Sequence, residues 1–270
     1  MPDRYLVVGH PVAHSKSPFI HAAFARQTGQ SLSYDRLDLA PDDFESGLAD
    51  FFALGGAGCN ITVPYKERAA GFANRLTERA AFAGAVNTLW LGDEGLVGDN
   101  TDGVGLVRDL KRHLALRDRR VLLLGAGGAA RGVLAPLLAE QPAQLVIANR
   151  SADKAAALAE LAAGLGRVES CAYEALDGDF DLVINATSAS LAGETLPLPE
   201  ALFSQGGLAY DMMYGQAPTA FLRQAEQLGA AVRLDGLGML VEQAAEAFRL
   251  WRGVQPDTAP VLLALRDSLG

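Results

Sequence analysis

Residues 121–130 read VLLLGAGGAA, a short apolar run followed by a glycine turn. The run Val121–Leu124 predicts a buried strand, and the alanine-rich segment Ala129–Ala139 predicts the helix after it. The turn has the G-x-G-x-x-A form, whose glycines allow a tight turn and a close approach of the backbone to a pyrophosphate at the helix N-terminus. We favour a Rossmann-type dinucleotide site over a purely structural turn. Its expected lining is Gly125, Ala126, Gly127, Gly128 and Ala129.

The next predicted strand distinguishes between the two nicotinamide dinucleotides. Leu145–Ala148 is followed by Asn149, Arg150 and Ser151, with no acidic residue among them. An NAD site would place Asp or Glu there, about 20 residues beyond the glycines, to hold the ribose hydroxyls. Arg150 instead suits a 2′-phosphate, and Ser151 and Lys154 can add donors. The segment therefore predicts NADP(H), the alternative being that Arg150 is a solvated residue at a strand end.

Strands and helices alternate on both sides of this segment. Further strands are predicted at Tyr5–Val8, Leu32–Leu37, Gly58–Val63, Ala85–Leu91, Asp181–Asn185 and Leu208–Asp211. Further helices are predicted at Pro18–Arg26, Asp42–Leu54, Arg75–Ala83, Val104–Leu114, Asp153–Ala163, Met239–Arg252 and Pro260–Ser268. The alternation indicates the α/β class with a mostly parallel sheet. A turn-rich boundary near residues 101–103 suggests two α/β domains, residues 1–101 plus 239–270 and residues 102–238, because the last two helices are expected to return to the first domain.

Composition and charge exclude several classes of protein. Half of the 270 residues are hydrophobic and 20% are charged, which excludes wholesale disorder. A net charge of −9 with only short basic spots argues against a nucleic-acid partner. Cys59 and Cys171 are far apart, and no apolar run suits a signal peptide or a membrane span, so a cytoplasmic protein is expected. The four histidines lack ligand spacing, so no metal is expected.

Three segments of the first domain place polar residues where a small molecule could bind. They contain Ser15 and Ser17, then Asn60, Thr62 and Lys66, and then Asn87 with the turn Asn100–Gly103. Two serine hydroxyls at a predicted helix N-terminus suit a carboxylate and equally suit a helix cap. A lone lysine is usually a solvated surface residue, and the asparagines and threonines are by themselves turn formers.

Taken together, these segments closely resemble the shikimate dehydrogenases. The resemblance covers nearly the whole chain in order, which makes it far more specific than any single motif. The matching segments are residues 9–18, 60–67, 84–88, 98–103, 125–132, 149–151, 185–188, 211–214 and 235–244. The chain departs from the usual pattern at Ala130, where serine is common, and after Tyr214, where the usual Thr-Pro is missing.

The resemblance implies an N-terminal substrate-binding domain, a Rossmann-type NADP-binding domain and an active site in the cleft between them. It implies reversible NADPH-dependent reduction of 3-dehydroshikimate to shikimate, a step towards chorismate and the aromatic amino acids. The substrate carboxylate and ring hydroxyls would be held by Ser15, Ser17, Tyr214, Asn60, Thr62, Asn87, Asp102 and Gln243. The cofactor would also meet Met212, Gly236 and, more weakly, Glu78.

By the same resemblance, Lys66 and Asp102 would be the catalytic pair. A free lysine is a ready acid and a poor base near neutrality. A neighbouring carboxylate would keep it charged, while desolvation would do the reverse. The sequence leaves open whether Lys66 alone or the Lys66–Asp102 pair transfers the proton.

Two other functions remain as alternatives. A quinate/shikimate dehydrogenase would accept either ring acid and a broader range of cofactors. A non-catalytic sensor of NADP or of a ring acid would have no need of both Lys66 and Asp102. The expected partners are small molecules, and the subunit state, monomer or homodimer, is left open.

Overall fold

The computed structural model describes residues 2–269, which divide into two compact units. Unit 1 contains the chain up to Gly105 together with Leu240–Ser268, and unit 2 contains Leu106–Met239. The helices α5 (Asp102–Leu110) and α9 (Leu237–Arg252) span the two points where the chain passes between the units. Within residues 2–269, no helix combines the length and the apolar character needed to cross a membrane.

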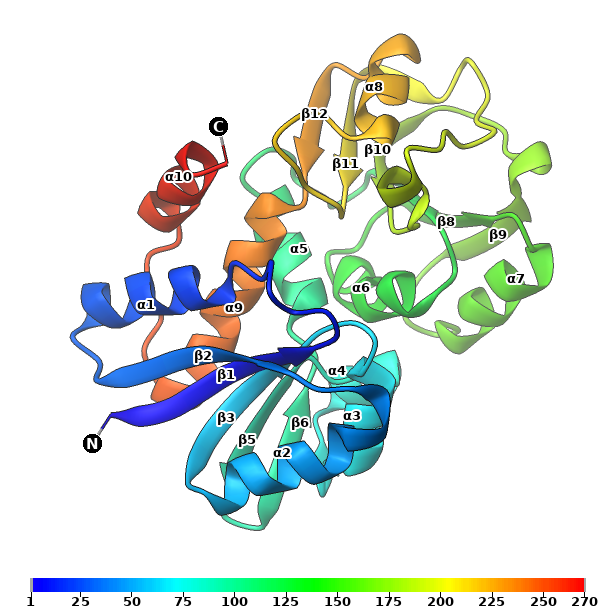
Figure 1. The fold of residues 1–270 in the computed structure, drawn as a ribbon. Helices are drawn as coiled ribbons and strands as arrows, with labels where there is room; N and C mark the ends of the chain where they lie inside the picture. The colour runs from blue at the N-terminus through cyan, green and yellow to red at the C-terminus, as the bar shows by residue number, and fades with distance from the viewer. Residues whose placement is uncertain (1, 270) are drawn as a thin grey trace. The chain divides into compact units, whose positions relative to one another are not determined.

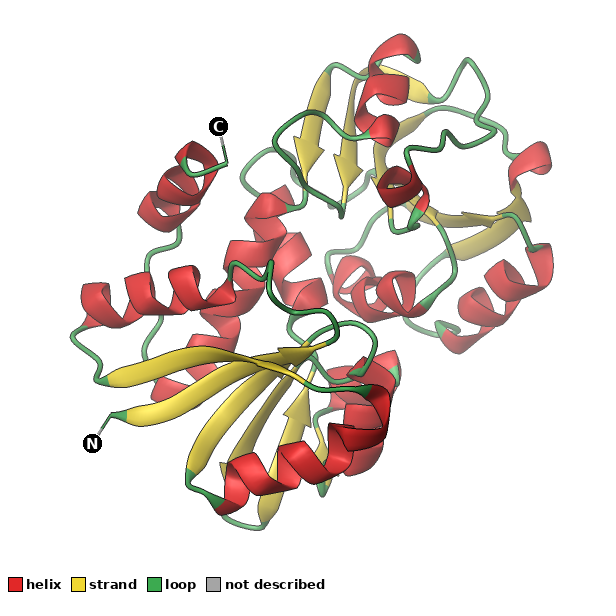
Figure 2. Cartoon of the chain, in the orientation of Figure 1, coloured by secondary structure: helices red, strands yellow, loops and turns green. Residues whose placement is uncertain are grey.

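Unit 1 is built on a six-stranded sheet in the order β2-β1-β3-β5-β6-β4 (Figures 1 and 2). Its strands are β1 (Asp3–Gly9), β2 (Leu32–Asp38), β3 (Gly56–Ile61), β4 (Arg75–Leu76), β5 (Thr88–Gly92) and β6 (Gly95–Asp99). Its other helices are α1 (Ser17–Thr28), a 3₁₀ turn η1 (Pro41–Asp43), α2 (Phe44–Ala53), α3 (Lys66–Phe72), α4 (Glu78–Ala83) and α10 (Ala259–Asp267).

Alternating side chains along β1 serve two separate cores. Leu6 and Val8 join the cluster that includes Phe44 of α2 and Ala69 of α3. Tyr5 and Val7 point to the opposite face, as the two-residue period of a strand requires, and there Trp251 of α9 packs beside them. Helices α2 and α3 therefore cover one face of the sheet, and α1 and α9 cover the other (Figure 1).

Unit 2 has a fully parallel six-stranded sheet in the order β12-β11-β10-β7-β8-β9. Numbered along unit 2 and taken from the other edge, this is the strand order 3-2-1-4-5-6 of the Rossmann fold. Its strands are β7 (Arg120–Leu124), β8 (Gln144–Asn149), β9 (Val168–Ala172), β10 (Phe180–Asn185), β11 (Phe203–Asp211) and β12 (Val232–Asp235). Its helices are α6 (Gly128–Ala139), α7 (Ala152–Leu161), α8 (Ala220–Gln227) and the 3₁₀ turns η2 (Tyr173–Ala175) and η3 (Ala189–Ala192).

Several expected elements of unit 1 were wrong in type or in bounds. The predicted helix Arg75–Ala83 begins as strand β4, and α4 starts only at Glu78, after the N-cap residue Thr77, whose hydroxyl accepts from Ala80 N. The predicted strand Ala85–Leu91 runs instead over Thr88–Gly92. The sheet is mixed, because β5 is antiparallel to both β3 and β6, but its other pairings are parallel, in agreement with the mostly parallel arrangement that was expected. Helix α3, which begins at Lys66, had not been predicted.

Candidate active site

The side chains of Lys66 and Asp102 form an ion pair in unit 1. Lys66 is the first residue of α3, and Asp102 is the first residue of α5. Lys66 Nζ donates to Asp102 Oδ2 at 2.6 Å, and the two side chains are 31% and 15% exposed. The pair is thus partly shielded from water yet open to a bound molecule. The two residues are 36 positions apart in the sequence, and they meet because the first residues of α3 and α5 lie next to each other.

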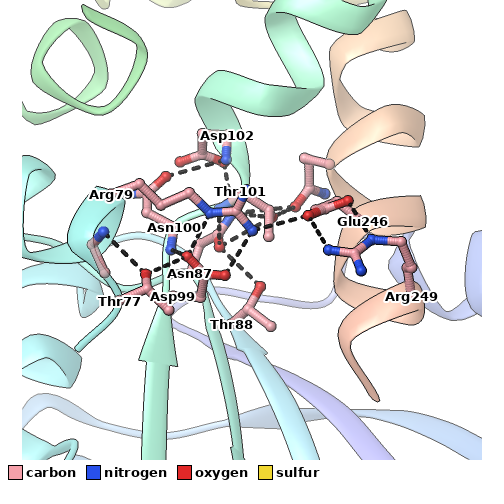
Figure 3. Close-up of polar contacts among 12 residues, drawn as sticks. Thr77, Arg79, Asn87, Thr88, Asp99, Asn100, Thr101, Asp102, Glu246 and Arg249 are labelled. Carbon is pink, nitrogen blue, oxygen red and sulfur yellow. Dashed lines mark hydrogen bonds and ion pairs between the residues drawn. The ribbon is translucent and has the colours of Figure 1, made fainter. Parts of the chain in front are cut away.

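Asn87 connects Asp102 of this pair to the neighbouring elements (Figure 3). Its Nδ2 donates to Asp102 Oδ1 at 2.8 Å, and it also lies 3.0 Å from Thr101 Oγ1 and 3.2 Å from Gln243 Oε1 of α9. Its Oδ1 accepts from Thr101 N at 2.9 Å. Since an amide nitrogen has only two hydrogens, the three acceptors share them. Asn87 is 2% exposed, so this network fixes the Asp102 carboxylate from inside unit 1.

Asn60 of β3 holds the backbone of Asn87 in place through a hydrogen bond. Asn60 is the next-to-last residue of β3, and its Oδ1 accepts from Tyr34 Oη at 2.7 Å. Its Nδ2 donates to the backbone oxygen of Asn87 and to Thr88 Oγ1, both at 3.1 Å. Thr62 follows the strand, and its backbone N donates to Val8 O. These hydrogen bonds occupy the Asn60 amide with partners inside the protein. Thr62 is half-buried and lies just before the turn that leads to Lys66 at the start of α3.

Ser15 and Ser17 lie at the start of α1 in unit 1. Ser17 is the first residue of the helix and is buried, and Ser15 Oγ accepts from Ser17 N at 3.3 Å. The N-cap residue of α1 is Lys16, and no side chain caps the helix, so this bond belongs to the turn before α1 and the helix-cap alternative is wrong. Arg36 of β2 donates to Ser15 O at 2.7 Å, and Asp38 accepts from Val12 N at 3.1 Å. Strand β2 therefore holds the serine loop at two points.

In unit 2, the glycine turn has the geometry that a dinucleotide needs. Gly125 has φ +106°, and a Cβ there would lie 3.0 Å from Thr187 Cγ2, so both conformation and space favour glycine. A Cβ on Gly127 would meet no atom within 4 Å. Gly127, Gly128 and Ala129 are all exposed, and α6 begins at Gly128. The first-turn N–H groups of α6 thus face open space, where phosphates can be bound.

The segment after β8 offers positive charge. Asn149 Nδ2 donates to Ser151 O at 3.0 Å, and Ser151 precedes the first turn of α7. Arg150 and Lys154 are exposed. Within residues 2–269, neither cation forms a hydrogen bond or an ion pair with the protein. Both are therefore available to an anionic ligand, as the NADP(H) prediction requires.

Asp211 orders the segment that contains Met212 and Tyr214. Its carboxylate accepts from Asn185 Nδ2 at 3.1 Å and from Met213 N at 3.0 Å. Burial raises the pKa of Asp211, and hydrogen bonds from side chains and the backbone oppose the rise. Burial also raises the pKa of the half-buried Tyr214, with Asp235 adding to the effect.

Two further residues, Gly236 and Glu78, were predicted to contact the cofactor, and they differ in where they lie in the fold. A Cβ on Gly236 would lie 2.1 Å from Met212 O, so the two backbones approach as only glycine permits. Glu78 is exposed in the first turn of α4 in unit 1, whereas the other predicted cofactor residues all belong to unit 2.

The network also contains residues that the sequence did not single out for a role. Thr101 had been treated only as a turn former, yet its N and Oγ1 both bond Asn87. Tyr34 ends the chain of bonds that reaches Asn87 through Asn60. The signal for Thr101 was its place beside Asp102, whereas Tyr34 read as an ordinary strand residue.

The fold and the glycine turn define a two-unit α/β protein with one Rossmann-type unit. Three family models match the chain. "Shikimate dehydrogenase substrate binding domain" matches residues 7–89, "Shikimate / quinate 5-dehydrogenase" matches residues 108–193, and "Shikimate 5'-dehydrogenase C-terminal domain" matches residues 236–266.

Relatives match the chain over its whole length. The shikimate dehydrogenase (NADP(+)) of Nitrosospira multiformis is 60% identical, covering 100% of this chain and 99% of its own. The crystal structure of an Ael1 enzyme from Pseudomonas putida has a TM-score of 0.93 and 50% identity over 97% of this chain and 98% of that one. Shikimate 5-dehydrogenase from Thermus thermophilus, in complex with NADP(H) and shikimate, has a TM-score of 0.85 and 36% identity over 99% and 100%. The chain belongs to the shikimate dehydrogenase family.

Proposed function

We propose that this protein is an NADP-dependent shikimate dehydrogenase that reversibly reduces 3-dehydroshikimate to shikimate for chorismate and aromatic amino-acid biosynthesis. The observation that carries the proposal is the Lys66–Asp102 pair at 2.6 Å, held by Asn87 in a chain of this family. Unit 1 would bind the ring acid and unit 2 the dinucleotide. Two distant cysteines without a disulfide and the lack of a membrane-spanning helix in the described residues support action in the cytoplasm.

Lys66 and Asp102 would transfer the proton to or from the substrate oxygen. Asp102 accepts on both oxygens, from Lys66 Nζ and from Asn87 Nδ2, so its carboxylate acts as an acceptor that orients Lys66. Lys66 keeps two further hydrogens, one of which can reach the substrate oxygen. We therefore favour Lys66 as the donor to the oxygen during reduction and Asp102 as its partner. NADPH, when bound, supplies the hydride.

The other polar side chains would position the ring acid. Ser15 and Ser17 would hold its carboxylate at the start of α1, with Tyr214 of unit 2 assigned to the same group by family resemblance. Thr62, Asn87 and Gln243 are assigned to its hydroxyls by family resemblance. Asn87 is buried and its amide bonds Asp102 and Gln243, so it would act mainly by holding these two side chains in place. Holding the ring in a fixed orientation towards the nicotinamide would accelerate hydride transfer, because the reacting atoms are already aligned.

The cofactor would be held by backbone and by cations. Its pyrophosphate would lie at the N-terminus of α6 above Gly127, and its 2′-phosphate beside Arg150 and Lys154. The close approach of Met212 and Gly236 would form another wall of this site. These residues fit a dinucleotide that carries an additional phosphate, which is why NADP(H) is preferred over NAD(H).

The deciding experiment measures initial rates with shikimate and with quinate, each against NADP and NAD, by nicotinamide absorbance. We expect the rate with shikimate and NADP to exceed the other three. Comparable rates with quinate would instead support the quinate/shikimate dehydrogenase. Binding without an absorbance change would support the sensor and contradict the proposal.

A variant of the pair tests the catalytic assignment. Lys66→Met should lower kcat by about 100-fold or more, the contribution typical of acid–base catalysis, with the affinity for NADP retained. The matched control is Lys111→Met, because Lys111 also forms an ion pair, with Glu140 at 2.9 Å, but lies in unit 2. Wild-type kcat in Lys66→Met would contradict the role of Lys66, whereas an equal loss in Lys111→Met would indicate a general effect of removing a lysine.

A further inference from the structure

A second charged cluster lies close to Asp102 in unit 1 (Figure 3). Arg79 of α4 donates from Nε to Asp99 Oδ1 and from Nη2 to Asp99 Oδ2, both at 2.6 Å. The same Nη2 lies 3.0 Å from Glu246 Oε1 of α9. The carboxylates of Asp99 and Glu246 are 1% and 3% exposed, and the Arg79 side chain is 27% exposed. One guanidinium thus bridges two buried carboxylates.

Asp99 is the last residue of β6, and the short loop that it starts ends at Asp102. Its carboxylate also accepts from Thr77 Oγ1 at 2.6 Å and from Asn100 N at 2.7 Å. Its backbone oxygen accepts from Asn87 N at 3.0 Å. Asn100 Oδ1 in turn accepts from Asp102 N at 3.1 Å. The loop is therefore fixed at one end by Arg79 and at the other by the bonds that place Asp102.

We propose that Arg79 is a positioning residue of the dehydrogenase: by clamping Asp99 and Glu246 it sets the loop 99–102 and so holds the Asp102 carboxylate against Lys66. The inference rests on the proposed function for its effect on catalysis. Arg79 has no place among the substrate, cofactor or proton-transfer residues assigned above, and it acts through Asp99 and Asn100.

Charge explains why Arg79 is needed at this position. Removing the guanidinium leaves the buried Asp99 without its cation, whereas Glu246 keeps Arg249, and a buried carboxylate is costly unless paired. Burial opposes the charge on Arg79, but its bonds and attraction to Asp99 and Glu246 outweigh this and raise its pKa above the ordinary value. The loop must then move for Asp99 to reach water, and Asp102 moves with it.

Arg249 provides a matched control on the same cluster. It also donates to Glu246, from Nε at 3.0 Å and from Nη2 at 2.8 Å, but makes no bond to Asp99 within the described chain. Its side chain is 44% exposed. Arg249→Gln should therefore leave kcat within about twofold of wild type, since the Arg79–Asp99 clamp remains.

The experiment compares Arg79→Gln, Arg79→Lys and Arg249→Gln by steady-state kinetics with shikimate and NADP. A displacement of about 1 Å at a reacting group can cost 100-fold, so Arg79→Gln should lower kcat by about 10- to 100-fold, with the KM for NADP within twofold. Arg79→Lys keeps a cation between the carboxylates and so preserves folding. It cannot fork onto both oxygens of Asp99, and its kcat should lie between wild type and Arg79→Gln.

A double-mutant cycle separates positioning from general damage. In an Asp102→Asn background, Arg79→Gln should change kcat by less than about twofold, because the group that Arg79 positions is already disabled. An equal loss in both backgrounds would overturn the inference, as would a wild-type kcat in both Arg79 variants.

A crystal structure of Arg79→Gln, or of Arg79→Lys if the first does not fold, tests the placement without reference to activity. Separation of Lys66 Nζ and Asp102 beyond hydrogen-bond reach supports the inference, and a retained pair overturns it. Wild-type protein that shows no turnover would contradict the proposed function, and the crystal structure would still decide the role of Arg79.

Discussion

Acidification should destabilise this protein through one buried histidine, His21 of α1. Its ring stacks on Tyr34 with centroids 4.2 Å apart and planes 5° apart, and Trp251 lies 5.2 Å away. Neither ring nitrogen makes a hydrogen bond with the described part of the chain. Burial lowers the pKa of His21 from 6.5 to about 3, an effect that the side chain of Asn60 opposes only in part. His21 is therefore neutral in the folded protein.

The size of the effect follows from the difference between the folded and unfolded pKa of His21. Below pH 6.5 the unfolded chain binds a proton at His21, whereas the folded protein does not. The free energy of unfolding therefore decreases as pH falls from 6.5 towards 3. Each pKa unit is worth about 1.4 kcal/mol. Between pH 7.5 and pH 5.0, the free energy of unfolding should fall by about 2 kcal/mol from His21 alone.

The assay is urea unfolding at pH 7.5 and pH 5.0 for wild type and His21→Phe. Phenylalanine keeps an aromatic ring against Tyr34 and does not titrate, so its loss between the two pH values should be smaller by about 2 kcal/mol. His14→Gln is the control for the loss of a histidine at an exposed position. Equal losses in wild type and His21→Phe would refute the assignment of a neutral, buried His21.

Two further substitutions test the cofactor site in unit 2. Arg150→Ala should raise the KM for NADP about 10-fold or more and leave that for NAD nearly unchanged, because it removes a charge-assisted bond to the 2′-phosphate; equal effects in initial-rate assays would contradict that role. Gly236→Ala should cost more than about 2 kcal/mol in thermal unfolding, since its Cβ would lie 2.1 Å from Met212 O. Gly71→Ala in α3, whose Cβ meets nothing within 4 Å, should instead be neutral or stabilising.

The Rossmann-type unit could be predicted from sequence because its central strands are continuously apolar. The strand expected at Val121–Leu124 is β7, which begins one residue earlier, and the helix expected at Ala129–Ala139 is α6. The edge strands β9 and β12 were missed. Their residues are mostly exposed or half-buried, so no apolar pattern marks them, and only pairing with β8 and β11 makes them strands.

In unit 1 the sequence identified residue types but not their contacts. Lys66, Asn87 and Asp102 were named from family resemblance, while their distances depend on where α3, α5 and the strand ends meet. The Arg79–Glu246 contact joins residues 167 positions apart. Nothing in the sequence distinguishes either residue from an ordinary exposed charge, because a charged side chain is usually exposed. Only the packing of α4 against α9 shows that one of them is buried.

The pairing of charges also resolves a difficulty raised by the acidic composition. A chain with a net charge of −9 should repel the two anions it is proposed to bind. Salt limits such repulsion to about 8–10 Å, so binding depends on cations near the ligand. Arg79 is committed to Asp99 and Glu246, whereas Arg150 and Lys154 have no carboxylate partner in the described chain. Binding of the dinucleotide phosphates would thus depend on these two unpaired cations, whose local attraction outweighs the distant repulsion from the net charge of the chain.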